Sequence, residues 1–176
     1  MASTYSSSLR IELIGAGEQA GTWNTTTNTN LGTLIEDAIA GYVTVSVTSA
    51  NQAFTALDGA PDQARNAVIA LTTTTGANFA VYAPPQEKTY VIYNTTAYTA
   101  TVYNSTVLGN TTAAGLGVAV AAGAKVAMFS NGTNFRTTDA VGFSGILPVA
   151  NGGTGLSSGT SGGVLAYTAT GTLASS

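Results

Sequence analysis

The side chains of this chain that are best suited to chemistry are its eight carboxylates. Glycoside hydrolysis needs two carboxyl groups that flank the bond to be cut. Glu36 and Asp37 are neighbours in a predicted helix, where adjacent side chains do not face each other. Asp58 and Asp62 flank a predicted turn. We therefore interpret these carboxylates as a helix cap and as solvated turn residues, and we expect no acid–base pair.

Two further motifs imitate catalytic sequences. Residues 15–20 (Gly-Ala-Gly-Glu-Gln-Ala) match the loose dinucleotide fingerprint, but the residues after them predict a loop and not the helix that this motif opens. Residues 159–163 (Gly-Thr-Ser-Gly-Gly) match the nucleophile elbow, which requires a general base. The chain has no His and no Cys, so it lacks the commonest base and every thiolate ligand. We expect no catalytic residue, no cofactor and no metal site.

The composition excludes several classes of partner. Charged residues make up 7% of the 176 residues, against about 25% in ordinary soluble domains. Five scattered basic residues and a net charge of −3 provide no basic patch for nucleic acid. The longest stretch without a strongly polar residue, 113–124, is too short to span a bilayer. Residues 1–5 resemble no targeting signal. We expect a soluble protein made in a cytoplasm, with no nucleic-acid partner and no membrane insertion.

Residues 1–41 form the first predicted region. Residues 1–10 are polar and are expected to be flexible or partner-bound, residues 9–14 show a short strand pattern, and residues 18–30 predict a polar loop around Trp23. A helix of about two turns is then predicted, with Thr33 as N-cap, Glu36 at N3 and Gly41 as its end. Its apolar face consists of Leu31, Leu34, Ile35, Ala38 and Ile39. Because so short a helix must dock on something, we expect another subunit to cover this face.

Residues 42–140 predict a β-sandwich body. Val43, Val45 and Val47 alternate with polar residues, as in a half-buried strand. Residues 89–94 and 97–104 predict one hairpin, and residues 116–120 and 125–130 form a second pair. Asn131-Gly132 predicts a two-residue turn before residues 133–137. Short strands at roughly ten-residue spacing favour an all-β sandwich.

Tyrosines gather in this body, at positions 82, 90, 93, 98 and 103. Flanked by Asn and Thr, Tyr93, Tyr98 and Tyr103 are candidates for contact with a sugar. Cross-strand aromatic pairing is the commoner explanation for such a cluster.

Residues 141–176 are the third predicted region, with nine glycines between 142 and 176. No compact core fits such a composition, which leaves a disordered tail or an extended segment that becomes ordered when wound with identical copies. Recurring apolar residues, among them Val149, Leu156 and Leu173, favour the second alternative. The predicted fold is therefore mainly β: a short-helix anchor, a sandwich-like body and a Gly-rich shaft segment.

Two stretches carry a resemblance to a known family. Residues 9–23 (LRIELIGAGEQAGTW), continuing into 28–36 (NTNLGTLIE), resemble the N-terminal module of bacteriophage tail-fibre and related virion proteins. Residues 148–155 (PVANGGTG) resemble an element found along phage fibre shafts, and residues 62–66 and 90–94 fit the same module.

The resemblance implies a homotrimeric structural protein of the virion, assembled in the bacterial cytoplasm, that attaches to other tail proteins and supports host recognition. Residues 1–41 would dock on the tail through Trp23, Leu31, Leu34, Ile35 and Ile39, and residues 142–176 would begin a trimeric shaft. The chain ends in an open pattern, so a longer fibre or a separate tip protein would complete it. The alternatives are a capsid fibre or head-decoration protein, a module that binds host glycan, and, least favoured, an enzyme that degrades surface polysaccharide.

Overall fold

The computed structural model describes residues 3–138, 163–169 and 172–175, and the chain divides into two compact units, Met1–Thr138 and Asp139–Ser176. The fold is mainly β, as the sequence predicts. The elements of the first unit are β1 (Thr4–Tyr5), β2 (Glu12–Leu13), α1 (Trp23–Thr29), the π-helical segment η1 (Asn30–Ile35), α2 (Glu36–Ala40), β3 (Tyr42–Val47), β4 (Asn51–Ala53), β5 (Val68–Thr73), β6 (Phe79–Ala83), β7 (Glu87–Asn94), β8 (Ala100–Asn104), β9 (Val118–Val120), β10 (Lys125–Asn131) and β11 (Phe135–Thr137).

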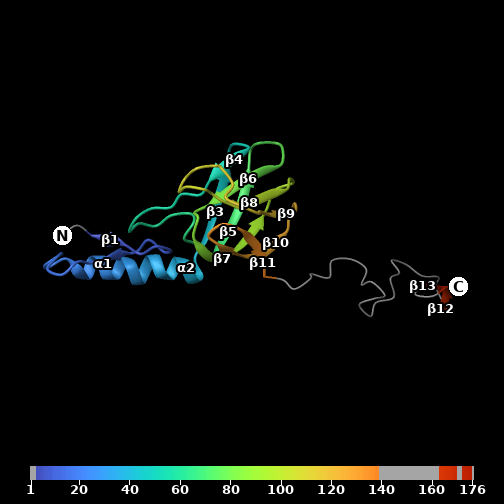
Figure 1. The fold of residues 1–176 in the computed structure, drawn as a ribbon, viewed down its shortest axis with the longest axis horizontal. Helices are drawn as coiled ribbons and strands as arrows, with labels where there is room; N and C mark the ends of the chain where they lie inside the picture. Colours follow the sequence, from blue (N-terminus) through green and yellow to red (C-terminus); the bar gives the residue numbers. More distant parts are fainter. Residues whose placement is uncertain (1–2, 139–162, 170–171, 176) are drawn as a thin grey trace. The chain divides into compact units, whose positions relative to one another are not determined.

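Residues 42–138 form a body of two sheets (Figure 1). The five-stranded sheet has the order β11-β10-β7-β5-β3, and the four-stranded sheet has the order β4-β6-β8-β9. One apolar cluster joins the two sheets, with Val45, Ile69, Ile92 and Met128 from the first and Val81, Val102 and Val120 from the second. The alternation predicted for residues 42–47 is confirmed, since Val45 and Val47 are buried and Tyr42, Thr44 and Ser46 are exposed.

The chain enters the two sheets in turn from β3 to β8, so it winds like a coil. β3, β5 and β7 pair in parallel within one sheet, and β4, β6 and β8 pair in parallel within the other. The hairpin predicted from residues 89–94 and 97–104 is therefore wrong, because β7 and β8 belong to different sheets. β9 and β10 are likewise separated and do not pair with each other. Four of the five links between consecutive strands of the coil have three to five residues, because each only crosses from one sheet to the other; the β4–β5 link is longer and comprises residues 54–67.

Two buried asparagines mark corners of this coil. Asn94 ends β7, and its Nδ2 donates to the carbonyls of Tyr98 at 2.7 Å and Val120 at 2.9 Å. Asn104 ends β8, and its Oδ1 accepts a hydrogen bond from Ser130 Oγ at 2.9 Å. Both side chains are fully buried; the Asn94 amide nitrogen has carbonyl partners, whereas Asn104 Nδ2 has no hydrogen-bond partner among the described residues. The near-repeats of the sequence, Tyr-Asn-Thr-Thr at 93–96 and Tyr-Asn-Ser-Thr at 103–106, thus close strands of opposite sheets.

The hairpin expected at Asn131-Gly132 is confirmed, because β10 and β11 pair antiparallel. The Asn131 N–H donates to the Asn134 carbonyl at 3.2 Å, which puts Gly132 and Thr133 at the tip. The turn therefore lies one residue later than predicted. Gly132 has a φ of +87°, a conformation that glycine adopts without strain.

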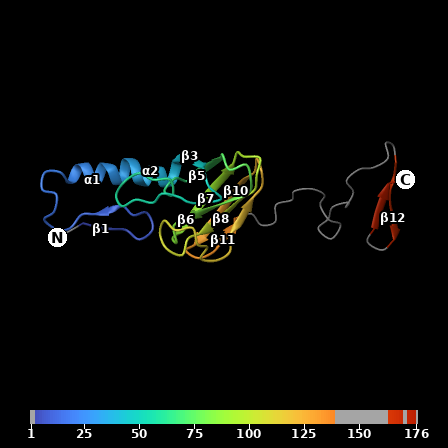
Figure 2. The same cartoon turned by 90° about the horizontal axis from the view of Figure 1, so that it is seen from above.

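A continuous helix of 18 residues, Trp23 to Ala40, precedes the body and lies beside the β1–β2 hairpin (Figures 1 and 2). The predicted loop at 18–30 and the predicted N-cap at Thr33 are wrong: the N-cap is Thr22, and Thr33 lies inside the helix. The polar residues of α1 have modest helix propensity, so long-range contacts outweigh local preference there. The predicted end at Gly41 is confirmed.

The second unit contains β12 (Leu165–Ala169) and β13 (Thr172–Ser175), which pair antiparallel. Tyr167 lies opposite Leu173, with a register irregularity between Tyr167 and Ala169. A two-stranded hairpin is marginally stable at best by itself. Most of the predicted shaft segment, including residues 148–155, lies outside the described residues.

Candidate docking surface

The Asn30 side chain joins the helix to the β1–β2 hairpin, because its amide bonds to the backbone of Glu12 as a neighbouring strand would. Asn30 Nδ2 donates to the Glu12 carbonyl at 2.8 Å, and Asn30 Oδ1 accepts from the Glu12 N–H at 3.2 Å. The Glu12 carboxylate in turn accepts hydrogen bonds from Ser3 and Gln19. The π-helical segment begins at Asn30, and such segments often accompany functional sites.

An open groove of about 370 Å³ runs between this hairpin and the helix. Its lining is mainly apolar and comes from both sides: Ile11, Glu12, Leu13, Ile14, Thr27, Asn30, Leu31 and Ile35. Leu13 and Leu31 are exposed at its walls. The polar bonds of Asn30 hold the two walls together, so the apolar side chains are free to contact another molecule.

The five helix residues predicted to dock do not form one surface. Leu34 is completely buried and serves the packing of the helix. Leu31 and Ile35 line the groove. Trp23, which opens the helix, is 59% exposed, and Ile39, near its end, is 76% exposed and does not line the groove. The predicted face is thus divided into a buried residue, a groove and two exposed ends.

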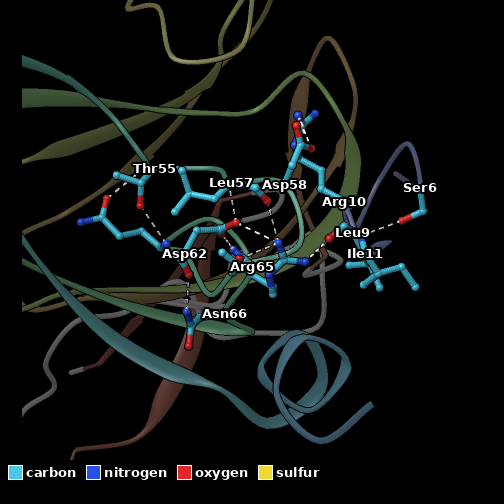
Figure 3. Close-up of polar contacts among 12 residues, drawn as sticks. Ser6, Leu9, Arg10, Ile11, Thr55, Leu57, Asp58, Asp62, Arg65 and Asn66 are labelled. Atoms are coloured by element: carbon cyan, nitrogen blue, oxygen red, sulfur yellow. Dashed lines mark hydrogen bonds and ion pairs between the residues drawn. The ribbon is translucent and has the colours of Figure 1, made fainter. Parts of the chain in front are cut away.

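A buried ion pair holds the N-terminal segment on the body (Figure 3). Arg65 Nη2 lies 3.0 Å from Asp62 Oδ2, and both side chains are almost fully buried. The Arg65 guanidinium also donates to the carbonyls of Leu57 at 3.0 Å and of Leu9, which belongs to the N-terminal segment. Each hydrogen bond of a buried charge is strong because the surroundings have a low dielectric. Arg65 therefore connects residues that are far apart in the sequence.

Three further contacts support the same attachment. Gln86 Nε2 donates to the Ser7 carbonyl at 2.6 Å, and the Gly59 N–H donates to the Arg10 carbonyl at 2.9 Å. Arg10 pairs with Asp58 at 2.6 Å on the surface. Residues 7–10, expected to be flexible or partner-bound, are bound by their own chain.

Lys88 lies in the same region. Its Nζ donates to the Asn66 carbonyl at 3.0 Å and lies 4.0 Å from the centroid of the Tyr90 ring. Burial lowers the pKa of the Lys88 ammonium to about 8, partly offset by the attraction of Asp62. The cavity next to Lys88 and Arg65 measures about 10 Å³, which suits a water molecule and no larger ligand. This cluster is suited to holding the chain together.

The carboxylates considered for catalysis are engaged in such contacts. Asp58 pairs with Arg10, and Asp62 pairs with Arg65 and accepts two backbone N–H groups. Glu36 and Asp37 form the first turn of α2. Within the part of the chain that the structure describes, no group of three or more acidic or other ligating side chains is arranged to hold a metal ion.

The three candidate sugar-contacting tyrosines lie apart. Tyr93 is on the outer face of the five-stranded sheet, with Lys125 Nζ 4.3 Å from its ring centroid. Tyr103 is on the outer face of the four-stranded sheet, stacked on Tyr82 at a centroid distance of 5.6 Å. Tyr98 packs against the core. The stack of Tyr82 and Tyr103 is the cross-strand pairing that the sequence suggested as the commoner explanation.

Sequence reasoning missed Asn30, Asp62, Arg65 and Gln86 as the residues that attach the N-terminal segment. The sequence indicated a role only for Asp62 and Arg65. These two residues are three positions apart, and they belong to the stretch 62–66 that carried the resemblance. Asn30 and Gln86 bind backbone atoms distant in the sequence, so nothing in their neighbourhood indicates the role.

Comparison with known proteins assigns no relationship to the chain: no family model, curated protein or solved structure matches it. Among the described residues, no helix is both long and apolar enough to cross a bilayer. What the chain does must therefore be argued from its own surfaces, and its most prominent one is the apolar groove beside the helix.

Proposed function

We propose that this chain is a non-catalytic subunit of a bacteriophage tail fibre. Residues 1–41 attach it to other tail proteins, and the Gly-rich region leads into a shaft shared by three copies. The β body is the structural domain that connects the two. The proposal assigns it to the virion, where it supports adsorption to the host. The resemblance of residues 9–23 and 28–36 to virion proteins motivates this proposal.

The observation that carries the proposal is the exposed apolar groove on an element held in place by polar bonds. Trp23 and Leu31 are each 59% exposed, although water-exposed large apolar groups are usually scattered singly. Here they accompany Leu13 and Ile14, which are also exposed, on the hairpin side. An interface needs both features: apolar groups to bury and a backbone that does not have to be ordered on binding.

Attachment is tested with particles of the phage that encodes the chain, assembled without it. The purified chain is expected to co-sediment with these particles and to restore their adsorption. The variant Trp23→Ala/Leu31→Ser removes two exposed apolar side chains from the docking surface. It should weaken binding by about a hundredfold, because two exposed apolar anchors are lost, one in the groove and one at the start of the helix.

The matched control is Val107→Ser/Leu116→Ser, which removes two side chains that are each 64% exposed on the body. The control should bind like the wild-type chain. If wild-type protein does not bind tail particles, or if the two double variants bind equally well, the docking assignment is wrong. Electron microscopy of the complex separates tail attachment from the alternative of a capsid fibre, because bound protein would then decorate heads.

A further inference from the structure

Two sets of exposed apolar side chains lie toward opposite edges of the five-stranded sheet, one beside acidic side chains and the other beside basic side chains. One set, the acidic side, lies at the β3 edge and consists of Glu36, Ile39 and Tyr42. The other set, the basic side, lies at the opposite edge on β10 and β11 and consists of Lys125, Phe129 and Arg136. The sheet order β11-β10-β7-β5-β3 separates the two edges by four strand spacings, roughly 19 Å.

Within residues 3–138, no element covers the acidic side. Ile39 and Tyr42 are 76% and 60% exposed, and Glu36 and Ile39 are neighbours on the helix surface, three residues apart. Residues 3–41 contain one base against four acids, a net charge of −3, and the base, Arg10, is paired with Asp58. Among the described residues, Glu36 makes no ion pair.

The basic side is exposed in the same way. Phe129 and Lys125 point outward from β10, while Met128 and Ser130 between and beside them point into the core. Phe129 lies directly opposite Arg136 in the β10–β11 pair. Lys125 contacts the Tyr93 ring, and within the described residues neither Lys125 nor Arg136 forms an ion pair. Glu87 is on the same face, opposite Asn131, and leaves a net charge of +1 there.

We infer that the acidic side of one copy docks on the basic side of the next copy. The helix end and the outer sheet face are both exposed although they belong to one chain, so neither covers the other within that chain. Ile39 and Tyr42 on one side and Phe129 on the other are exposed apolar groups, and packing the two sides together removes them from water. Opposite charges at the rims set the orientation and disfavour contacts between like sides.

Such a contact joins two different surfaces, so it is heterologous and repeats until a ring closes. With three copies, every acidic side and every basic side is covered. The inference rests on the assembly role proposed above and specifies where its copies meet. It leaves the groove and Trp23, at the other end of the helix, free for the tail.

The test is a charge exchange in the full-length chain, followed by light scattering over a concentration series. The wild-type chain should reach three times its 17.5 kDa mass. Glu36→Lys should weaken association by about tenfold or more, and Lys125→Glu/Arg136→Glu should do the same, because an attraction becomes a repulsion. Combining all three substitutions should restore most of the lost association.

Two controls make the result specific. Thr111→Lys/Thr112→Lys changes the net charge by as much as Glu36→Lys at exposed positions elsewhere, and it should associate like wild type. Ile39→Gln tests the apolar contribution at a residue too exposed to affect folding, and it should also weaken association by about tenfold. Circular dichroism verifies that each variant is folded.

The inference is overturned if the wild-type chain is a monomer at all concentrations, if either charge reversal leaves association unchanged, or if the combined variant does not recover. A monomer that still co-sediments with tail particles overturns this inference alone. A closed trimer that binds no particle overturns the proposed attachment alone.

Discussion

The helical region, residues 3–41, and the β body, residues 42–138, are stabilised in opposite ways. The body surrounds one continuous core from both sheets, with many completely buried apolar side chains. Among the described residues of the helical region, Leu34 is the single apolar side chain that is buried. That region is held instead by polar contacts to backbone atoms, through Asn30, Arg65 and Gln86. A region that does not bury its own apolar groups keeps them available for partners.

The difference also predicts how each region unfolds. Local stability follows the number of buried apolar contacts, so the helical region belongs to the low-stability end of the molecule. The body should unfold as one cooperative unit.

The largest effect is expected at the ion pair that joins the regions. Arg65→Met leaves the Asp62 carboxylate buried and unpaired and releases the Leu9 carbonyl. The free energy of unfolding should fall by about 4 kcal/mol, measured by urea denaturation. Hydrogen exchange should accelerate in residues 3–13 more than in β7. The double variant Arg65→Met/Asp62→Leu should be less destabilised than Arg65→Met. If hydrogen exchange in Arg65→Met accelerates no more in residues 3–13 than in β7, Arg65 stabilises the body and not the attachment of the N-terminal segment.

Truncation of an apolar side chain should distinguish the two regions next. Ile92 is fully buried in the body, and Ile92→Ala should lower the free energy of unfolding by about 3 kcal/mol. Ile39→Ala removes the same atoms from an exposed position and should change it by less than about 0.5 kcal/mol in the monomer. Similar losses from the two variants would contradict the view that the apolar groups of the helix are kept for partners.

Replacing two glycines of the helical region by alanine should change the stability of the protein in opposite directions. A Cβ at Gly41, where the helix ends, would lie 2.4 Å from the Asp37 carbonyl oxygen and 2.6 Å from Asn66 Oδ1. Gly41→Ala should therefore destabilise the protein by about 2 kcal/mol. A Cβ at Gly32 meets nothing within 4 Å, so Gly32→Ala should stabilise the helix by up to about 1 kcal/mol. Thermal unfolding of both variants checks the pair, and a neutral Gly41→Ala would show that the junction between the regions is loose.

The smallest effect concerns pH. Because burial lowers the pKa of Lys88 to about 8, the unfolded chain binds more protons than the folded chain between pH 8 and 10.5. Stability should therefore rise as the pH increases from 7 to 9, by about 1 kcal/mol. Above about pH 10.5 it should fall, since burial raises the pKa of Tyr90 and keeps that phenol neutral in the folded state only. In Lys88→Met the rise should disappear, and a rise that persists would assign it to another group.

Short-range patterns of the sequence were sufficient for several parts of the fold. The alternation at residues 42–47 and the helix end at Gly41 are found where they are predicted, and the turn near Asn131-Gly132 lies one residue later. Each depends on residues within a few positions, because the period of side-chain burial and the conformational freedom of glycine are local properties. The apolar spacing from Leu31 to Ile39 likewise identified a helix, although its first turns were missed.

The start of that helix could not be predicted from the residues around it. Residues 24–30 are mostly Thr and Asn, which favour caps and turns over helix interiors. They are helical because Asn30 satisfies the backbone of Glu12 and because Thr26 bonds to Gln19. Of the candidate docking residues, Trp23 and Ile39 proved exposed, whereas Leu34 faces inward, a distinction that spacing on one helix face does not make.

The amino-acid sequence by itself determined that this protein is mainly β, that an apolar-faced helix ending at Gly41 precedes the body, and where single strands and turns lie. Only the tertiary structure decided which strands are partners, so that residues 89–94 and 97–104 belong to different sheets and Tyr93 and Tyr103 face opposite ways. It also decided that Arg65 and Asp62 bind the N-terminal segment. The physical reason is the distance along the chain over which each effect acts. Side-chain periodicity and turn conformation depend on neighbouring residues, whereas strand pairing and buried ion pairs depend on segments that are distant in the sequence.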